Sequence, residues 1–242
     1  MQRILFFSDT HLSPAEPERT VFLADFMENQ SKNTAFYILG DLFDIWIGPG
    51  HIKLMEYQHI LNRLKILTSA GMDINFIPGN RDYMVGPELT EATGVRVLPE
   101  MFELNANGKK LLLTHGDLLC THDRDYQRYR RVVQSGVVKT ITRNLPHSMG
   151  RTIGRGLKKI SARSKGTKTS ASKDIVMDTV KEYLDQSFDA IICGHIHKAQ
   201  HIEVLSSGKI KHLFVTGALA PDGKGGFDLP CVSLIKGKLE LL

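Results

Sequence analysis

The chain has 242 residues, few cysteines and no long hydrophobic run. Its three cysteines, Cys120, Cys193 and Cys231, are odd in number and follow no pattern, which argues against a disulfide framework and favours a reducing compartment, most simply the cytoplasm. No apolar stretch approaches the roughly 18 residues of a membrane-spanning helix. The opening MQRILFFSDTHL has no signal-peptide layout, because Asp9 and His11 directly follow its short apolar stretch.

Internal repeats, low-complexity segments and linker-like composition are also missing from the chain. Hydrophobic residues make up 42% and charged residues 24%, proportions that exclude a disordered, collagen-like or coiled-coil protein. The length corresponds to one large domain or two small ones, at roughly 100–200 residues per domain. We expect a single domain over residues 1–242, with a helical insert at about 121–173.

Acidic residues are absent from residues 126–173, a segment that holds thirteen of the 31 Lys and Arg residues. Outside it, the remaining 18 basic residues are outnumbered by 26 acidic ones. The chain is therefore an acidic body with one strongly basic insert. This asymmetry indicates an anionic partner for the insert, which could be a nucleic acid, a membrane surface or an anionic substrate.

Short apolar runs that end in polar residues predict five buried strands. They lie at 3–8, 35–40, 73–78, 110–115 and 189–194. Apolar residues at helical spacing lie between the early runs, and alternating strands and helices predict an α/β sheet with crossover connections. After residue 194, short strand-like runs are separated by Gly and Ser, and we expect them to continue the core in antiparallel fashion.

The basic insert carries apolar residues at every fourth position, a pattern typical of an amphipathic helix. They are Val133, Val137, Ile141, Leu145, Met149, Ile153 and Leu157. Pro146 must break or kink a helix here, so we expect two or more helices. Two interpretations stay open at this point: a cap whose apolar stripe packs on the body, or a surface that receives an apolar ligand.

Residues able to bind a metal follow each of the five predicted strands. The motifs are D-x-H at Asp9 and His11, G-D at Asp41, G-N-R-D at Asn80, H-G-D at His115, and G-H-x-H at His195 and His197. Ligands collect at the carboxyl ends of the strands in an α/β sheet, so we expect these seven side chains to converge. We expect Asp44, Asp82 and Asp117 to hold imidazoles or backbone in place rather than to bind metal.

Two carboxylates, four imidazoles and one amide oxygen form a mixed nitrogen and oxygen set without thiolate. Such a set suits Mn²⁺, Fe²⁺ or Zn²⁺ better than Mg²⁺ or Ca²⁺. Seven ligands are too many for one catalytic ion but suit two ions that share a carboxylate. A two-metal site generates hydroxide at neutral pH and stabilises both sides of an in-line displacement at phosphorus.

The motif order resembles the calcineurin-like metallophosphoesterase superfamily, and the resemblance covers almost the whole chain outside the insert. It implies a four-layer α/β/β/α sandwich with a dinuclear metal site. Carried over by motif, one metal would be bound by Asp9, His11, Asp41 and His197, and the other by Asp41, Asn80, His115 and His195, with Asp41 bridging.

A narrower resemblance rests on YILGDLFDIWIG (37–48), G-N-R-D (79–82), HGDLLCTHDRDYQRYR (115–130) and the basic insert before SKDIVMD (172–178). These segments resemble the UDP-2,3-diacylglucosamine pyrophosphatase family of lipid A biosynthesis. That resemblance implies cleavage of UDP-2,3-diacylglucosamine to UMP and 2,3-diacylglucosamine 1-phosphate by a hydroxide that two Mn²⁺ ions activate. It also implies a peripheral position on the cytoplasmic face of the inner membrane, with the insert as a lid over the acyl chains.

The same resemblance implies roles for individual residues. Catalysis would involve Asn80, Arg81 and His195, and substrate contacts would come from Asn80, Arg81, Asp123, Tyr126, Ser164, Lys173 and His195. The chain departs from the family in two places. Lys198 and Ala199 follow the last motif where the family often has Arg-Pro, and Pro49 and Gly50 replace acidic residues after W-I-G.

Two other functions remain possible on the residues. One is a related phosphoesterase that acts on nucleotides, nucleic acids or phosphoproteins, since a basic insert alone would allow nucleic acid. The insert interleaves aliphatic rather than aromatic residues, however, and single strands need stacking platforms, so we expect no nucleic-acid partner. The other is a scaffold without metals, against which all seven ligand positions carry ligand-capable residues. The oligomeric state stays open.

Overall fold

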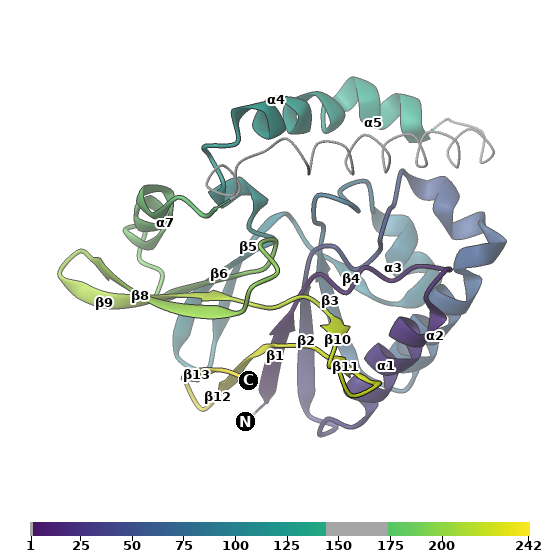
Figure 1. Cartoon of the computed structure of the whole chain (residues 1–242), viewed down its shortest axis with the longest axis horizontal. Coiled ribbons are helices and arrows are strands. Elements are labelled where there is room, and N and C mark those ends of the chain that lie inside the picture. The colour runs from purple at the N-terminus through teal and green to yellow at the C-terminus, as the bar shows by residue number, and fades with distance from the viewer. Residues whose placement is uncertain (1, 144–173) are drawn as a thin grey trace.

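The computed structural model describes residues 2–143 and 174–242, which form two β-sheets packed face to face (Figure 1). In the larger sheet the spatial order is β13 (Lys238–Leu241), β12 (Val232–Ile235), β1 (Arg3–Phe7), β2 (Thr34–Leu39), β3 (Asp73–Ile77) and β4 (Arg96–Val97). In the smaller sheet it is β5 (Met101–Ala106), β6 (Lys109–Thr114), β7 (Ala190–Cys193), β9 (Lys209–Val215) and β8 (Gln200–Ser206). A separate hairpin joins β10 (Ala220–Pro221) and β11 (Phe227–Asp228).

Helices cover the outer face of each sheet. The larger sheet is covered by α1 (Pro17–Glu28), α2 (Gln58–Ser69) and α3 (Pro87–Thr93), and the smaller one by α7 (Met177–Leu184). Short 3₁₀ turns lie at η1 (Pro49–Lys53), η2 (Met55–Tyr57) and η3 (Asp117–Leu119). Both α1 and α3 begin with a proline, whose fixed φ and missing N–H suit the first helical position. The four layers confirm the predicted α/β/β/α sandwich.

The central strands read as continuous apolar runs because both of their faces are buried. In β1, Ile4 and Phe6 pack between the two sheets, whereas Leu5 and Phe7 pack against the helices of the larger sheet. The strand β7 alternates in the same way between the sheet interface and α7. This arrangement leaves the polar residues at the strand ends as the natural place for a site.

All five predicted strands are confirmed, as β1, β2, β3, β6 and β7, but they divide between two sheets. The predicted antiparallel continuation is wrong for one pairing. Although β8–β9, β12–β13 and β1–β12 are antiparallel, β9 pairs with β7 in parallel. The strand β5 was not predicted, because its residues MFELNA are only partly buried and carry no strong apolar run.

The first part of the insert forms α4 (Arg124–Val133) and α5 (Gly136–Arg143). The predicted helix breaks here, earlier than Pro146, because Gly136 is a poor helix former and Ser135 Oγ accepts a hydrogen bond from the Val138 N–H at 3.4 Å. Pro146 and the apolar positions from Leu145 onward lie outside the described residues. Among those that are described, no helix combines the length and apolar character needed to cross a bilayer.

Candidate metal centre

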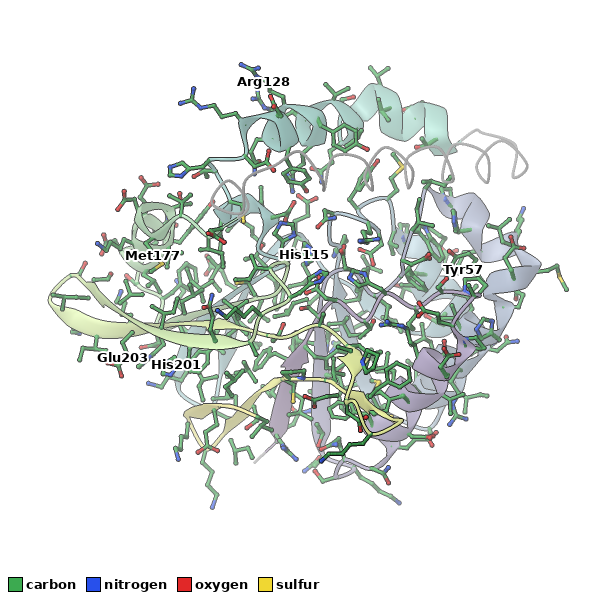
Figure 2. The ribbon with its side chains drawn as sticks, in the orientation of Figure 1. Tyr57, His115, Arg128, Met177, His201 and Glu203 are labelled. Carbon is green, nitrogen blue, oxygen red and sulfur yellow. The ribbon has the colours of Figure 1, made fainter. Side chains whose placement is uncertain are left out.

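The seven predicted ligands lie together where the ends of β1, β2, β3, β6 and β7 meet. Figure 2 shows one of them, His115, in the middle of the molecule, below α4. A first group forms around Asp9 Oδ1, which lies 3.2 Å from His197 Nε2 and 4.0 Å from His11 Nε2. The Nε2 atoms of the two imidazoles are 3.4 Å apart. A second group forms around Asn80 Oδ1, which lies 2.9 Å from His115 Nε2 and 2.8 Å from His195 Nδ1.

Asp41 connects these two groups. Its Oδ1 lies 3.7 Å from His115 Nε2, and its Oδ2 lies 3.9 Å from His11 Nδ1. Asp9 has a similar position, because its carboxylate lies within 4.8 Å of ligand atoms of Asp41 and His115 as well as of His11 and His197. The geometry therefore brings two carboxylates, rather than Asp41 alone, within reach of both groups.

Five of the seven predicted ligands have a left-handed backbone, which non-glycine residues seldom adopt and which occurs preferentially at functional sites. Their φ angles are 54° at Asp9, 47° at His11, 52° at Asp41, 74° at His195 and 59° at His197. In addition, a glycine precedes His195 because nothing larger fits. A Cβ at Gly194 would lie 1.9 Å from Ser8 Oγ and 2.5 Å from Asp9 Oδ2.

Electrostatics within the centre are dominated by the burial of Asp9 and Asp41, which are at most 1% exposed. Burial raises the pKa of Asp41 to about 6, and the nearby charge of Asp9 adds to this rise. For Asp9, burial acts in the same direction, but His197 and the charge of His115 outweigh it and hold the pKa of Asp9 well below its usual range. Burial lowers the pKa of His195 to about 4.

The pKa of His115 is shifted upward, whereas that of His195 is shifted downward. Burial alone would lower the pKa of His115, but Asp41 and Asp9 raise it to about 9. His115 Nδ1 lies 2.8 Å from the Leu39 carbonyl, and its Nε2 lies 2.9 Å from Asn80 Oδ1.

These residues fit a metal centre. Asp9 Oδ1 and His11 Nδ1 are buried and have no hydrogen-bond partner, and leaving such atoms unpaired is costly. The donor set contains only nitrogen and oxygen atoms, as expected for Mn²⁺, Fe²⁺ or Zn²⁺. Ligands must be deprotonated to bind a metal, so metal binding at this centre should depend on pH.

Asp82 orients the loops that carry two of the ligands. Its Oδ1 accepts hydrogen bonds from the backbone N–H groups of Gly79 at 2.7 Å and Asp41 at 3.2 Å, and its Oδ2 accepts one from Phe43 at 3.1 Å. This contact agrees with the expectation that Asp82 holds backbone in place. Asp44 contacts a side chain instead, since it accepts a hydrogen bond from the Tyr57 hydroxyl at 2.9 Å.

Asp117 ties α4 to the centre through a set of contacts that we name the Asp117 clasp. The Tyr126 hydroxyl donates to Asp117 Oδ2 at 2.5 Å, and Arg130 Nε donates to the same oxygen at 3.0 Å. Arg130 also pairs with Glu100 at 2.7 Å. Burial raises the pKa of Asp117, but the charges of nearby histidines and of Arg130 hold it below its usual range. No role was predicted for Arg130, although it closes the segment 115–130 on which the narrower resemblance rests, because it is one of many cations in a basic helix.

Only some of the predicted substrate contacts lie at the metal centre. Arg81 lies at the centre, with Nε 3.5 Å from Asp41 Oδ2 and its backbone N–H donating to Asp41 Oδ1 at 2.8 Å. The Tyr126 ring is 6.3 Å from the His195 ring, while Asp123 accepts a hydrogen bond from the Tyr126 N–H and caps α4. Ser164 and Lys173 lie outside the described residues.

Two residues that were not predicted from the sequence, Ser8 and Thr216, support Asp9. Ser8 Oγ donates a hydrogen bond to Asp9 Oδ2 and lies 2.6 Å from Thr216 Oγ1. Ser8 could have been found from its place directly before the D-x-H motif. Thr216 follows β9 outside any motif, so only the fold reveals its role.

Known proteins are similar to this chain over most of its length. The family model for calcineurin-like phosphoesterases matches residues 2–199. A UDP-2,3-diacylglucosamine hydrolase of Edwardsiella ictaluri is 37% identical and covers 88% of this chain and 83% of its own length. Proteins with the same name from Serratia proteamaculans and Psychromonas ingrahamii are 35% and 31% identical, covering 90% and 89% of this chain and 92% and 89% of their own.

Steric crowding at Gly194 leads to a first prediction. Gly194→Ala should displace Ser8 or Asp9, because the added Cβ has no room, and overpacking of this kind costs about 1–3 kcal/mol. We expect lower stability in urea unfolding and weaker binding of Mn²⁺ by titration calorimetry. Gly136→Ala is the matched control, since a Cβ there meets nothing within 4 Å. Equal metal affinity in the two variants would contradict the predicted role of this contact.

Proposed function

This chain belongs to the calcineurin-like phosphoesterase family, and from that premise we propose that it hydrolyses the pyrophosphate bond of UDP-2,3-diacylglucosamine. The products would be UMP and 2,3-diacylglucosamine 1-phosphate, an intermediate of lipid A biosynthesis. The observation that carries the proposal is that relatives named for this substrate match 82–90% of the chain. A cluster of seven ligand-capable side chains lies within the matched region.

We propose that the cluster holds two Mn²⁺ ions, with Fe²⁺ or Zn²⁺ as alternatives. One would be bound by Asp9, His11, Asp41 and His197, and the other by Asp41, Asn80, His115 and His195. When bound, the ions would supply Lewis acidity and lower the pKa of a water molecule. The short distances among these side chains support this assignment, such as the 3.2 Å between His197 Nε2 and Asp9 Oδ1.

Arg81, Asn80 and His195 are the proposed catalytic residues of the protein itself. The Arg81 guanidinium is about one-quarter exposed and lies beside Asp41, where it can bind a phosphate oxygen and stabilise negative charge. Asn80 and His195 contact each other and orient the same phosphate group. The leaving group is a phosphate monoester, which leaves far more readily than an alkoxide and needs little protonation. An arginine at position 81 can therefore act without a general acid.

We propose that the chain is a single domain whose insert, residues 121–173, is a lid that contacts the acyl chains and the anionic surface of the inner membrane on its cytoplasmic side. Asp123, Tyr126, Ser164 and Lys173 are the proposed substrate contacts of this insert. The described part supports this, because apolar Val132 and Val137 are 63% and 70% exposed. Arg128 also points away from the body (Figure 2).

Product identification tests the proposed reaction. Purified protein with Mn²⁺ should convert UDP-2,3-diacylglucosamine to UMP and 2,3-diacylglucosamine 1-phosphate, as measured by mass spectrometry. Asp41→Ala should abolish this turnover, because it removes a carboxylate shared by both ligand groups. Bis(p-nitrophenyl) phosphate serves as the comparison substrate. Turnover of that plain phosphodiester without turnover of the lipid nucleotide would replace the proposal with a different phosphoesterase activity.

Arg81→Ala tests the role of the guanidinium. We expect kcat/KM to fall by about 10²–10³, the scale observed when one donor to a developing oxyanion is removed. Metal content, measured by plasma emission spectroscopy, should stay unchanged, because Arg81 is not one of the proposed ligands. Arg96→Ala is the matched control, since Arg96 is exposed and pairs with Asp73 away from the centre. Loss of metal together with activity would show that Arg81 is structural.

Vesicle binding tests the membrane proposal. Each basic residue near an anionic surface contributes about 1 kcal/mol, so Arg128→Ala with Arg131→Ala should weaken binding to phosphatidylglycerol vesicles about 10- to 30-fold. Salt should weaken it too, since surface charge is screened. Val132→Ser should reduce binding more than Ile210→Ser, because both side chains are 63% exposed but only Val132 lies on the insert. Binding that ignores lipid charge would leave the insert as a cap.

A further inference from the structure

A cavity adjoins the metal centre on the side of the β10–β11 hairpin. Its volume is about 600 Å³, within the range of about 300–1,000 Å³ typical of ligand pockets. The lining includes His197, Ala199, Asp222, Lys224, Phe227 and Asp228. We call it the hairpin pocket. His197 belongs both to this pocket and to the metal centre, where its Nε2 lies 3.2 Å from Asp9 Oδ1.

We propose that the hairpin pocket binds the nucleoside monophosphate half of the substrate, with Lys224 and Asp228 as its charged contacts. This inference rests on the proposed function, in which a pyrophosphate joins a uridine half to a diacylated half. The pocket lies mostly beyond residue 199, the end of the family-model match.

The position of the pocket separates the two halves of the substrate. In Figure 1 the helices α4 and α5 lie along the top of the molecule, whereas the β10–β11 hairpin lies well below them. A pyrophosphate bound at the metal centre has its two substituents at opposite ends of the P–O–P bridge. One half therefore extends toward α4 and the other toward the hairpin.

The chemical character of the two surfaces indicates which half of the substrate each would bind. The hairpin pocket is lined by charged residues and by small Gly, Ala and Pro residues, with Phe227 as its one large apolar side chain. That surface cannot bury two acyl chains. In contrast, α4 and α5 expose the apolar Val132 and Val137. The polar nucleotide half is therefore the one that fits the hairpin side.

Lys224 and Asp228 supply the contacts that a nucleotide needs. An exposed carboxylate at Asp228 can accept hydrogen bonds from ribose hydroxyls, as acidic residues do in dinucleotide-binding folds. The Lys224 ammonium can pair with a phosphate oxygen. Asp222 is already engaged, since its Oδ1 accepts from the backbone N–H groups of Lys224 at 2.7 Å and Gly226 at 2.9 Å. That turn presents the Lys224 side chain at the rim.

The pocket is a built part of the structure. Its Phe227 ring lies 5.6 Å from the Phe22 ring and 5.6 Å from the Arg19 guanidinium. Arg19 in turn donates to the Leu219 carbonyl at 2.9 Å, and the Leu219 N–H donates to the Asp9 carbonyl at 3.2 Å. The hairpin is thus connected by hydrogen bonds to a proposed metal ligand. A preformed surface of this kind loses less entropy when a ligand binds.

The test compares the two reaction products as ligands of the Mn²⁺-loaded protein. Lys224→Ala and Asp228→Asn should each weaken UMP binding about tenfold or more in titration calorimetry, because each removes a charge-assisted contact. The inhibition constant of 2,3-diacylglucosamine 1-phosphate should stay unchanged. Ala220→Trp, which fills the pocket without changing its charge, should weaken UMP binding as well. Matched controls are Lys209→Ala and Asp178→Asn, both exposed and remote from the pocket.

The outcomes separate the pocket from the proposed function. Selective loss of UMP affinity in the pocket variants supports the inference. Unchanged UMP affinity in all three variants overturns it, as does an equal loss for both products, which would indicate general damage to the site. Failure of the wild-type protein to hydrolyse UDP-2,3-diacylglucosamine overturns the proposed function instead. The titration with UMP does not depend on turnover, so in that case it would still test whether the hairpin pocket binds a nucleotide.

Discussion

The burial of two carboxylates, Asp9 and Asp41, is the constraint on which the ends of both sheets depend. Removing an ionised carboxylate from water costs several kcal/mol unless close partners compensate it. Backbone N–H groups supply part of that compensation, from His195 to Asp9 Oδ2 at 2.9 Å and from Arg81 to Asp41 Oδ1. Imidazoles supply more, yet Asp9 Oδ1 still lacks a hydrogen bond. The protein thus builds a buried site with a negative potential, which is the kind of site that attracts a cation.

The same constraint explains the unusual backbone of the site. Side chains from strands of two different sheets must point at one small volume, and an extended strand cannot turn that sharply. The chain therefore enters the left-handed region at five predicted ligands, a conformation that costs of order 1–3 kcal/mol per residue. The surrounding structure maintains it through Asp82, which binds three backbone N–H groups, and through the absence of a side chain at Gly194. Strain and electrostatic repulsion are both concentrated where the chemistry is proposed to occur.

Features that depend on local sequence patterns could be predicted, whereas features that depend on contacts between residues far apart in the chain could not. The five central strands were predictable because burial on both faces produces continuous apolar runs such as RILFF in β1. Convergence of the seven ligands followed from their positions at strand ends. The division of the strands between two sheets was not predictable from periodicity, since Leu112 in β6 and Ile38 in β2 look alike in sequence but face different helices. Thr216 and Arg130 also escaped notice, because their partners Ser8 and Asp117 are brought close only by the fold.

The Asp117 clasp attaches the start of the insert to the body of the protein. Asp117 is almost fully buried, and both Tyr126 and Arg130 of α4 bind its Oδ2. Lifting α4 from the body would break both of these contacts to Asp117. Glu100 would lose its partners Arg130 and Gln134 at the same time. The helix α4 is therefore anchored to the body by side-chain contacts at the edge of the site. The Tyr126 ring lies 6.3 Å from the His195 ring. The contacts of α4 with Asp117 and Glu100 therefore hold the start of the insert next to the proposed metal ligands.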